Sequence, residues 1–312
     1  MPGFKILFIG GSSLELVVNM YKVPEPGEYI TDDGGVAYIP GGKAALAAIA
    51  AQRMGAESVL CTNLGRDTHG QQLFNYYKDS GLDSSLIKVD RELPSGFTLV
   101  IKDSEGQPRR VNYPGANLGL STETVISAIQ CSPDAVYITF EIPFAVALTA
   151  ARAASAAGIP IFIDACPASA DYPLEDLPPV EIFSLNAAET FEYTGEMPMG
   201  SSASLRAALA LTKRVDCKYL VIKQGSRGSF LYDGKHYRME AAIRLDKPQD
   251  TSGVGDIFTS ALVLEYIRSK YDIGTALKYA TSAAALSVTR IGAASSIPTD
   301  EEVMQVYNSG AN

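Results

Sequence analysis

The sequence has few of the residues on which histidine and thiol chemistry depend. Among 312 residues there are two histidines, His69 and His236, so a histidine-rich metal site or a His-based catalytic triad has very few candidate parts. No Cys-x-x-Cys pair occurs, and three of the four cysteines lie in or beside apolar runs, so we expect buried free thiols in a reducing compartment. The cysteines are Cys61, Cys131, Cys166 and Cys217. Carboxylates, backbone amides and lysine remain for chemistry.

Excess positive charge and long apolar runs are also missing. The net charge is -9 and the pI is near 4.9, whereas binding to nucleic acid or to an anionic membrane needs clustered lysine and arginine. The alanine-rich runs at 43–51 and 281–288 are too short to span a bilayer, and the first residues lack a signal-peptide pattern. We expect a cytoplasmic protein that acts on a small diffusible substrate, with no nucleic-acid or membrane partner.

The composition is that of a globular protein, with 46% hydrophobic and 20% charged residues. Short apolar runs, each typical of a buried strand, recur along the chain, and from the third run on they alternate with helix-like segments. The runs lie at 4–11, 57–65, 134–140, 159–165, 181–186 and 218–225. This rhythm predicts an α/β fold with a doubly wound, mainly parallel sheet in a Rossmann-type, three-layer arrangement.

Two segments break this rhythm. Residues 23–40 are rich in proline and glycine, and residues 96–115 alternate apolar and polar side chains like an antiparallel hairpin. We expect 13–40 and 95–114 to form a small antiparallel β-sheet lid, and 1–12, 41–94 and 115–312 to form the α/β core. Such an appendage covers a site or makes a dimer contact, and a decorative insertion is the alternative.

The stretch DTSGVGDIF, residues 250–258, places two glycines and a carboxylate where a helix with an apolar face begins. A helix N-terminus offers unpaired amides and positive dipole charge, and glycines let a phosphate oxygen approach the backbone. A carboxylate there would repel a phosphate unless it removes the proton of an attacking hydroxyl. Asp256 is therefore a candidate general base, with simple helix capping as the alternative. No Walker-type G-x-x-x-x-G-K-[ST] loop occurs, which excludes P-loop transfer.

This stretch resembles the second signature of the ribokinase-like carbohydrate kinases, the phosphofructokinase-B (PfkB) family, and IPGGKAALAAIAAQRMGA at 39–56 resembles the first. Further motifs follow in the family's order: VPEPGEYI, YPGAN, SLNAAETFEYTG, VIKQGSRGSFLY and ALSVTRIGAASSIP. The resemblance runs from Ile6 to Pro298. It implies ATP- and Mg²⁺-dependent phosphorylation of a hydroxyl on a small sugar, by a homodimer joined through the lid.

The resemblance assigns roles around the nucleotide. It implies that Asp256 is the base and that the amides of Gly253, Val254 and Gly255 form an anion hole. Asn186 and Glu189 are implied to organise Mg²⁺ through water, and an N-terminal cap is the alternative. Implied ATP contacts are Lys223, Gly225, Ser226, Gly228 and Thr281, although QGSRG alone is also typical of a hairpin turn. An activating potassium ion is implied, largely on backbone carbonyls, at Asp250, Ser252, Ser287, Arg290, Gly292 and Ser296.

At the acceptor end the sequence departs from ribokinase itself. The corresponding residues are Ser13, Glu15, Gly41, Gly42, Lys43, Leu46 and Glu141. Ribokinase has Asn, Asp and Asn where this chain has Ser13, Glu15 and Leu46. A sugar hydroxyl facing a leucine stays unpaired, at roughly 1–3 kcal/mol, so the preferred acceptor need not be ribose. Glu15 still offers a carboxylate to sugar hydroxyls and so favours a polyol as the acceptor. Arg109 and Arg110 keep an already phosphorylated sugar possible as the acceptor, with two solvent-exposed arginines on a strand as the alternative.

Two other functions compete with the sugar kinase. A nucleoside kinase of the same fold would pack Leu46 and Tyr38 against a base. A catalytically silent binding module would require loss of the base or of the anion hole, yet Asp256 and both glycines are present.

Overall fold

The protein is described by a computed structural model that covers residues 3–103 and 108–310. Its main sheet has nine strands in the order β13-β12-β11-β10-β9-β8-β1-β4-β5. Their bounds are β1 (Lys5–Ile9), β4 (Glu57–Gly65), β5 (Ile87–Asp90), β8 (Ala135–Thr139), β9 (Ile161–Asp164), β10 (Val180–Asn186), β11 (Cys217–Lys223), β12 (Ser229–Tyr232) and β13 (Tyr237–Glu240). Every pair from β5 to β11 is parallel, and β12 and β13 add antiparallel pairs at one edge. The predicted mainly parallel sheet is confirmed.

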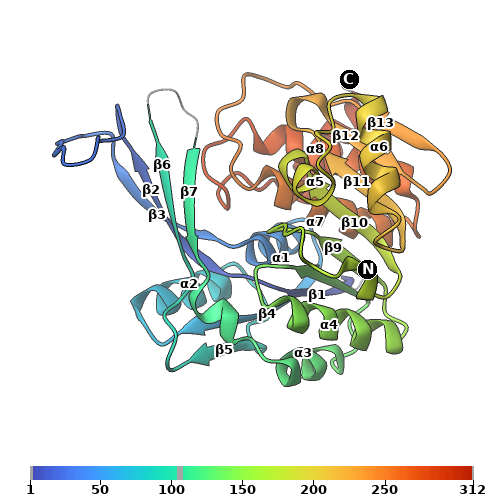
Figure 1. Cartoon of the computed structure of the whole chain (residues 1–312), viewed down its shortest axis with the longest axis horizontal. Coiled ribbons are helices and arrows are strands. Elements are labelled where there is room, and N and C mark those ends of the chain that lie inside the picture. Colours follow the sequence, from blue (N-terminus) through green and yellow to red (C-terminus); the bar gives the residue numbers. More distant parts are fainter. Residues whose placement is uncertain (1–2, 104–107, 311–312) are drawn as a thin grey trace.

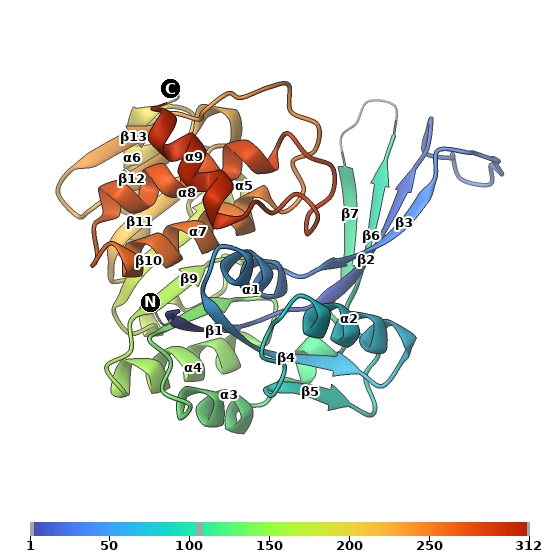
Figure 2. The ribbon, with the colours of Figure 1, turned by 180° about the vertical axis from the view of Figure 1, so that it is seen from behind.

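Helices cover both faces of this sheet, which gives the predicted three layers (Figures 1 and 2). One face carries α1 (Lys43–Arg53), α2 (Thr68–Asp79), α7 (Val254–Arg268), α8 (Ile273–Ser287) and α9 (Asp300–Ser309). The other carries α3 (Thr122–Ile129), α4 (Phe144–Ala156), α5 (Ala187–Thr194) and α6 (Ser201–Leu211). Short 3-10 turns are η1 (Gly115–Gly119), η2 (Leu174–Asp176) and η3 (Gly225–Arg227).

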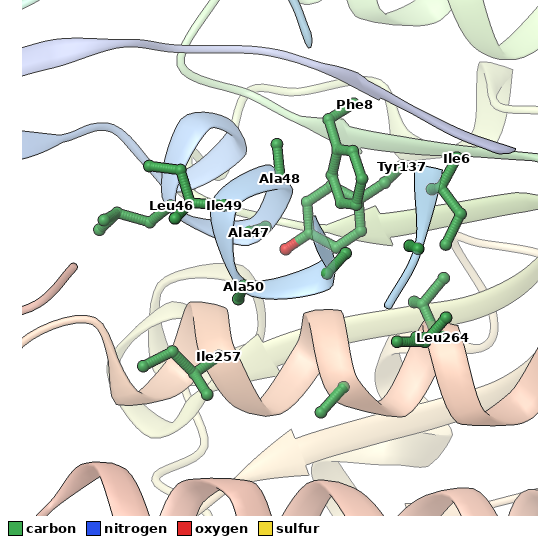
Figure 3. Packing of buried hydrophobic residues seen from close by; sticks show 14 of the residues in the cluster. Ile6, Phe8, Leu46, Ala47, Ala48, Ile49, Ala50, Tyr137, Ile257 and Leu264 are labelled. Carbon is green, nitrogen blue, oxygen red and sulfur yellow. The ribbon is translucent and has the colours of Figure 1, made fainter. Parts of the chain in front are cut away.

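The apolar strands are buried on both sides because their side chains alternate in direction. In β1, Ile6 and Phe8 pack in the cluster under α1 and α7, whereas Leu7 and Ile9 pack in the cluster under α3 and α4. Figure 3 shows Phe8 beside Tyr137 in the first cluster. A continuous apolar run thus serves two cores at once.

Helices α1 and α7 are packed closely against each other. The alanines of α1 are fully buried, and their small side chains allow a near approach. The hydroxyl of Ser260 on α7 donates to the carbonyl oxygen of Ala47 on α1 at 2.6 Å. The first turns of both helices are therefore held at fixed positions relative to each other.

A separate small sheet contains β3 (Val36–Gly41), β2 (Ser13–Asn19), β6 (Phe97–Lys102) and β7 (Pro108–Tyr113), in that order. The pairs β2/β3 and β6/β7 are antiparallel, as predicted, while the central β2/β6 pair is parallel. Figures 1 and 2 show this sheet extending away from the main one. Of the predicted lid segments, residues 104–107 lie outside the described residues. The division of the chain into core and lid units remains a prediction.

The cysteines differ in exposure. Cys61 is buried, which raises its pKa to about 12, and Cys166 and Cys217 are partly buried. Cys131 is exposed, so the expectation of buried thiols is wrong there, because it follows the last turn of the surface helix α3. All four are free. In the described part of the chain, no helix has the length and apolar character needed to cross a membrane.

Two glycines near the β12 hairpin give a matched test of backbone packing. Gly228 and Gly234 share a left-handed φ of 88°, but a Cβ on Gly228 would lie 1.9 Å from the carbonyl oxygen of Glu240, whereas one on Gly234 meets nothing within 4 Å. We expect Gly234→Ala to lower the free energy of unfolding by about 1–2 kcal/mol through backbone strain. Gly228→Ala should lower it by roughly 2 kcal/mol more, because β13 must move. Urea unfolding measures both, and equal losses would contradict the contact.

Candidate active site

The first turn of α7 presents free backbone amides. Its N-cap residue Gly253 has a left-handed φ of 72°, and no side chain caps the helix. Within the described residues, no acceptor pairs with the amides of Gly253, Val254 or Gly255. Such amides, at the positive end of a helix dipole, can bind an anion.

Asp256 lies in this first turn and faces the start of α1. Its side chain is nearly buried, with 6% of the residue exposed, and its Oδ1 accepts a hydrogen bond from Lys43 Nζ at 2.7 Å. The carboxylate therefore contacts a lysine from a distant helix and does not cap its own helix, so the capping alternative is not what the structure shows. Its other oxygen, Oδ2, has no hydrogen-bond partner within the described residues.

A second carboxylate, Asp164, lies at the end of β9 with 0% of the residue exposed. Its Oδ2 accepts from Lys223 Nζ at 2.6 Å and from Thr259 Oγ1 at 3.0 Å, and Lys43 Nζ lies 3.9 Å from its Oδ1. Burial acts to raise its pKa, but the charges of the two lysines outweigh burial, and the pKa lies below its usual value. The sequence analysis missed this residue. Two features of the sequence could have identified Asp164: it is a carboxylate, and it ends an apolar run predicted to be a strand. Ligands bind at the carboxyl ends of the strands in a parallel sheet.

Glu141, just after β8, caps α1 from outside the helix. Its Oε2 accepts from the backbone amide of Lys43 at 2.7 Å, which compensates for the absence of a capping side chain at Gly42. Burial raises the pKa of Glu141 to about 7; the charge of Lys43 opposes this shift and that of Asp256 adds to it. A Cβ on Gly11 would lie 2.5 Å from the Cβ of Glu141, so that glycine, also missed from sequence, makes room for the carboxylate.

Glu15 on β2 has a similar arrangement. A Cβ on Gly41 would lie 2.5 Å from its Cγ, and one on Gly42 would lie 2.6 Å from the Gly11 carbonyl oxygen, so both positions of the Gly-Gly pair need glycine. Burial raises the pKa of Glu15. Ser13, also on β2, is buried, and its Oγ is 3.5 Å from the hydroxyl of Thr98. The fold thus gathers the predicted acceptor residues around the start of α1.

Two residues invoked for acceptor specificity lie differently from expectation. Leu46 is only 3% exposed and packs in the core near Ile49 (Figure 3), so its role as an acceptor contact remains a prediction. Tyr38 is 60% exposed and pairs with Leu16, on the opposite face of the small sheet from Glu15. This position does not favour the nucleoside alternative, in which Tyr38 would pack against a base.

The two arginines of β7 lie on opposite faces of the small sheet. Arg109 forms an ion pair with Asp103. Arg110 pairs with Val100 in the strand register and shares the face of Glu15, where its charge acts to lower the Glu15 pKa against the larger effect of burial. Only Arg110 therefore lies on the acceptor side.

Asn186 and Glu189 form a capping box at the start of α5. The Glu189 amide donates to Asn186 Oδ1 at 2.9 Å, and the Asn186 amide donates to Glu189 Oε2 at 2.6 Å, which is the arrangement of the capping alternative. Oε1 of Glu189 has no hydrogen-bond partner in the described part of the chain, so a water-mediated Mg²⁺ contact fits the pair. No group of three or more acidic, histidine or cysteine side chains with metal-site geometry occurs among the described residues.

The predicted ATP residues are only partly available to a ligand. The Lys223 ammonium turns inward to Asp164, and a Cβ on Gly255 would point toward it at 3.9 Å, so the bare start of α7 faces a cation. Thr281 donates its hydroxyl to the Leu277 carbonyl oxygen at 2.8 Å within α8. Gly225 and Ser226 lie in η3, and Gly228 ends it.

The side chains predicted near a potassium ion bind one another. Asp250 Oδ1 accepts from the Ser252 amide, and Oδ2 accepts from the Gly292 amide and from Lys102 Nζ at 3.2 Å. The remaining pairs are Ser287 with Ser296, and Arg290 with Glu302. Because the predicted potassium contacts are largely backbone carbonyls, these side-chain pairs do not decide whether an ion binds there, and the potassium site remains a prediction.

The raised pKa of Glu141 predicts a pH dependence of stability. A folded-state pKa of about 7, against 4.5 ordinarily, means that the folded protein binds this proton more tightly than the unfolded chain does. The resulting stabilisation is fully present below about pH 4.5 and is lost as pH rises through about 7. In Glu141→Gln, the free energy of unfolding should fall less between pH 5 and pH 8, by on the order of 1–3 kcal/mol. Urea unfolding across this range tests it, and an unchanged dependence would contradict the raised pKa.

Comparisons with known proteins agree with this geometry. Residues 4–300 match the model of the pfkB family carbohydrate kinases. The chain is 27% identical to a ribokinase of Staphylococcus aureus over 309 residues, which are 97% of this chain and 99% of that protein. It is 28% identical to a bifunctional ribokinase/ribose-5-phosphate isomerase A of Fructilactobacillus sanfranciscensis, over 97% of this chain but only 56% of that protein.

Among solved structures, Arabidopsis thaliana ribokinase complexed with ribose and ATP superimposes with a TM-score of 0.85 at 25% identity, covering 98% of this chain and 99% of that one. The family match spans almost the whole chain, and the α/β core with its small second sheet is the fold of these enzymes. The chain therefore belongs to the pfkB family of carbohydrate kinases.

Proposed function

We propose that this kinase transfers the terminal phosphoryl group of ATP to a hydroxyl of a small sugar in the cytoplasm, with Asp256 as the general base. The observation that carries this proposal is the position of Asp256, whose carboxylate lies between the free amides of α7 and the ammonium of Lys43. A helix dipole, a cation and a proton acceptor in one place suit transfer of an anionic group to an alcohol.

The acceptor would bind at the start of α1. Carboxylates accept hydrogen bonds from sugar hydroxyls, and Glu15 and Glu141 offer them from two sides, with Ser13 adding a hydroxyl. Both carboxylates lie close to the backbone, because Gly11 and Gly41 have no Cβ atom in the space that Glu141 and Glu15 occupy. These three polar side chains favour a polyhydroxylated acceptor over an apolar one.

Lys43 orients the base. Because its ammonium holds Oδ1 of Asp256, the other carboxylate oxygen is left for the acceptor proton. The amides of Gly253, Val254 and Gly255 face the same region and would stabilise negative charge that develops during transfer. The chain's own groups thus both activate the alcohol and receive the anion.

Binding of the nucleotide is assigned to residues at the ends of β10 and β11. Bound Mg²⁺ neutralises phosphate charge, and Asn186 and Glu189 are the residues that would hold it through water. We assign the ATP contacts to Lys223, Gly225, Ser226, Gly228 and Thr281. We further propose a potassium requirement, with the ion held largely on backbone carbonyls near Asp250.

The small sheet is proposed to act as a lid and as a dimer contact. Its inner face carries Glu15 and would exclude water from the acceptor. Its outer face exposes apolar side chains that a second copy of the chain would cover. These are Val36, Tyr38, Val111 and Tyr113. The lid would comprise 13–40 and 95–114, with the core formed by 1–12, 41–94 and 115–312.

A change at the base tests the proposed chemistry. Asp256→Asn keeps the shape of the side chain and an acceptor for Lys43 but removes the proton acceptor, so we expect kcat to fall by roughly 10³-fold or more. The KM for ATP should stay within a few fold. A coupled assay of ADP formation measures both values, with circular dichroism as the control for folding. Near-normal turnover would reject Asp256 as the base.

A change at Leu46 tests the argument about acceptor preference. Leu46→Asn supplies a hydrogen-bonding group, so we expect kcat/KM for ribose to rise by about tenfold relative to other sugars. Ile49→Asn, a similarly buried position of the same cluster, is the matched control and should leave the preference unchanged. An unchanged preference in Leu46→Asn would contradict the role of Leu46.

The coupled assay of ADP formation is run with a panel of sugars and nucleosides as acceptors. The preferred acceptor decides between the sugar kinase and the nucleoside kinase. The outward position of Tyr38 argues against a stacked base. ADP formation with any acceptor would exclude a silent binding module.

A further inference from the structure

Asp164 carries a buried oxygen with no hydrogen bond. Its Oδ2 accepts from Lys223, Thr259 and, at 3.4 Å, the hydroxyl of Tyr137, while Oδ1 has no hydrogen-bond partner in the part of the chain that the structure describes. An unsatisfied buried carboxylate oxygen is costly, so its retention calls for an explanation. The Lys43 ammonium lies 3.9 Å from Oδ1, too far for a hydrogen bond.

Four charges from four elements make up this cluster. Lys43 on α1 and Lys223 on β11 balance Asp164 on β9 and Asp256 on α7. The balance changes when Asp256 takes a proton, because its carboxylate becomes neutral and the Lys43 ammonium loses its anionic partner. The ammonium is then closest to the unpaired oxygen of Asp164, and a small rotation of the flexible lysine side chain would bring the two into contact.

We propose that Asp164 is a positioning residue for phosphoryl transfer: it fixes Lys223 through Oδ2 and receives Lys43 through Oδ1 as Asp256 accepts the acceptor's proton. This inference rests on the proposed function. In the step itself, the O–H bond of the acceptor breaks and the proton goes to Asp256. The electron pair stays on the acceptor oxygen, which bonds to the terminal phosphorus of ATP, while the bond from that phosphorus to the bridging oxygen breaks and its electron pair leaves on ADP. Lys43 changes partner and keeps its protons.

A purely structural role for Asp164 makes a different prediction. If it only anchors Lys223, its loss would alter folding or nucleotide binding and would leave kcat at saturating ATP and acceptor close to the wild-type value. If it acts on Lys43 and Asp256, its charge belongs to the electrostatic environment of the base. The other charged or titratable groups facing this centre come from five segments: Glu15 from β2, Tyr137 from β8, Glu141 from the segment after β8, Cys166 from the segment after β9 and Glu189 from α5.

The decisive variant is Asp164→Asn, which keeps the shape and removes the charge. We expect kcat to fall by about 30-fold or more, with KM values for ATP and acceptor within about threefold. The acid limb of the kcat pH profile should move to lower pH by about one unit, because a carboxylate with one negative neighbour fewer ionises more easily. Tyr137→Phe is the matched control, because it removes an uncharged hydrogen-bond donor to Oδ2 of Asp164 and leaves the charge in place. The acid limb of the kcat pH profile should not move in this variant.

The proposed function is tested separately from this inference. It is established if the wild-type protein phosphorylates an acceptor and Asp256→Asn abolishes that turnover. With that in hand, an acid limb in Asp164→Asn at the wild-type position would overturn the inference and leave the kinase assignment standing. If Asp164→Asn does not fold, the comparison moves to Lys43→Met. In Lys43→Met, Asp164 keeps its bond to Lys223 but has no second ammonium to receive. Its kcat should fall by about 30-fold or more and its acid limb should move to higher pH, because Asp256 loses a neighbouring cation. Wild-type values of kcat and of the acid limb in Lys43→Met would overturn the inference.

Discussion

The contact between Lys43 and Asp256 is the interaction on which the site depends. It joins the first turns of α1 and α7, which are 213 residues apart in the chain, and it leaves Oδ2 of Asp256 without a protein partner in the described part of the chain. A buried ion pair contributes little net stability, since the loss of hydration opposes the attraction. Its contribution here is geometric, because Lys43 holds one oxygen of Asp256, the proposed base, while the two helices are also joined through Ser260.

Glycines, which have no Cβ atom, shape the proposed acceptor end of the site. Glu141 lies where Gly11 has no Cβ, and Glu15 lies where Gly41 has none. The carboxylates are thereby buried next to the backbone, and burial raises the pKa of each. The absence of a Cβ at these two glycines therefore sets the position of the carboxylates that would hold a sugar, and burial there raises their proton affinity.

The general outline could be predicted from sequence because it depends on local patterns. Continuous apolar runs predicted the parallel sheet, and the glycine-aspartate stretch predicted a helix start close to Gly255, where α7 begins at Val254. Asp164 was missed because its importance comes from Lys223 and Lys43, which meet it only after three distant elements assemble. The side on which Tyr38 lies could not be predicted, because a strand pattern gives alternation but does not say which face will look toward the site.

The sequence by itself determined the layered α/β architecture, the free amides at the start of α7 and the kind of chemistry, since short-range spacing decides where strands and helix ends fall. Only the tertiary structure decided which charges become partners. Electrostatic pairing depends on distances of a few ångströms between segments far apart along the chain, and packing sets those distances. The link from Lys43 to Asp256, and the unpaired oxygen of Asp164 beside it, exist only in the folded protein.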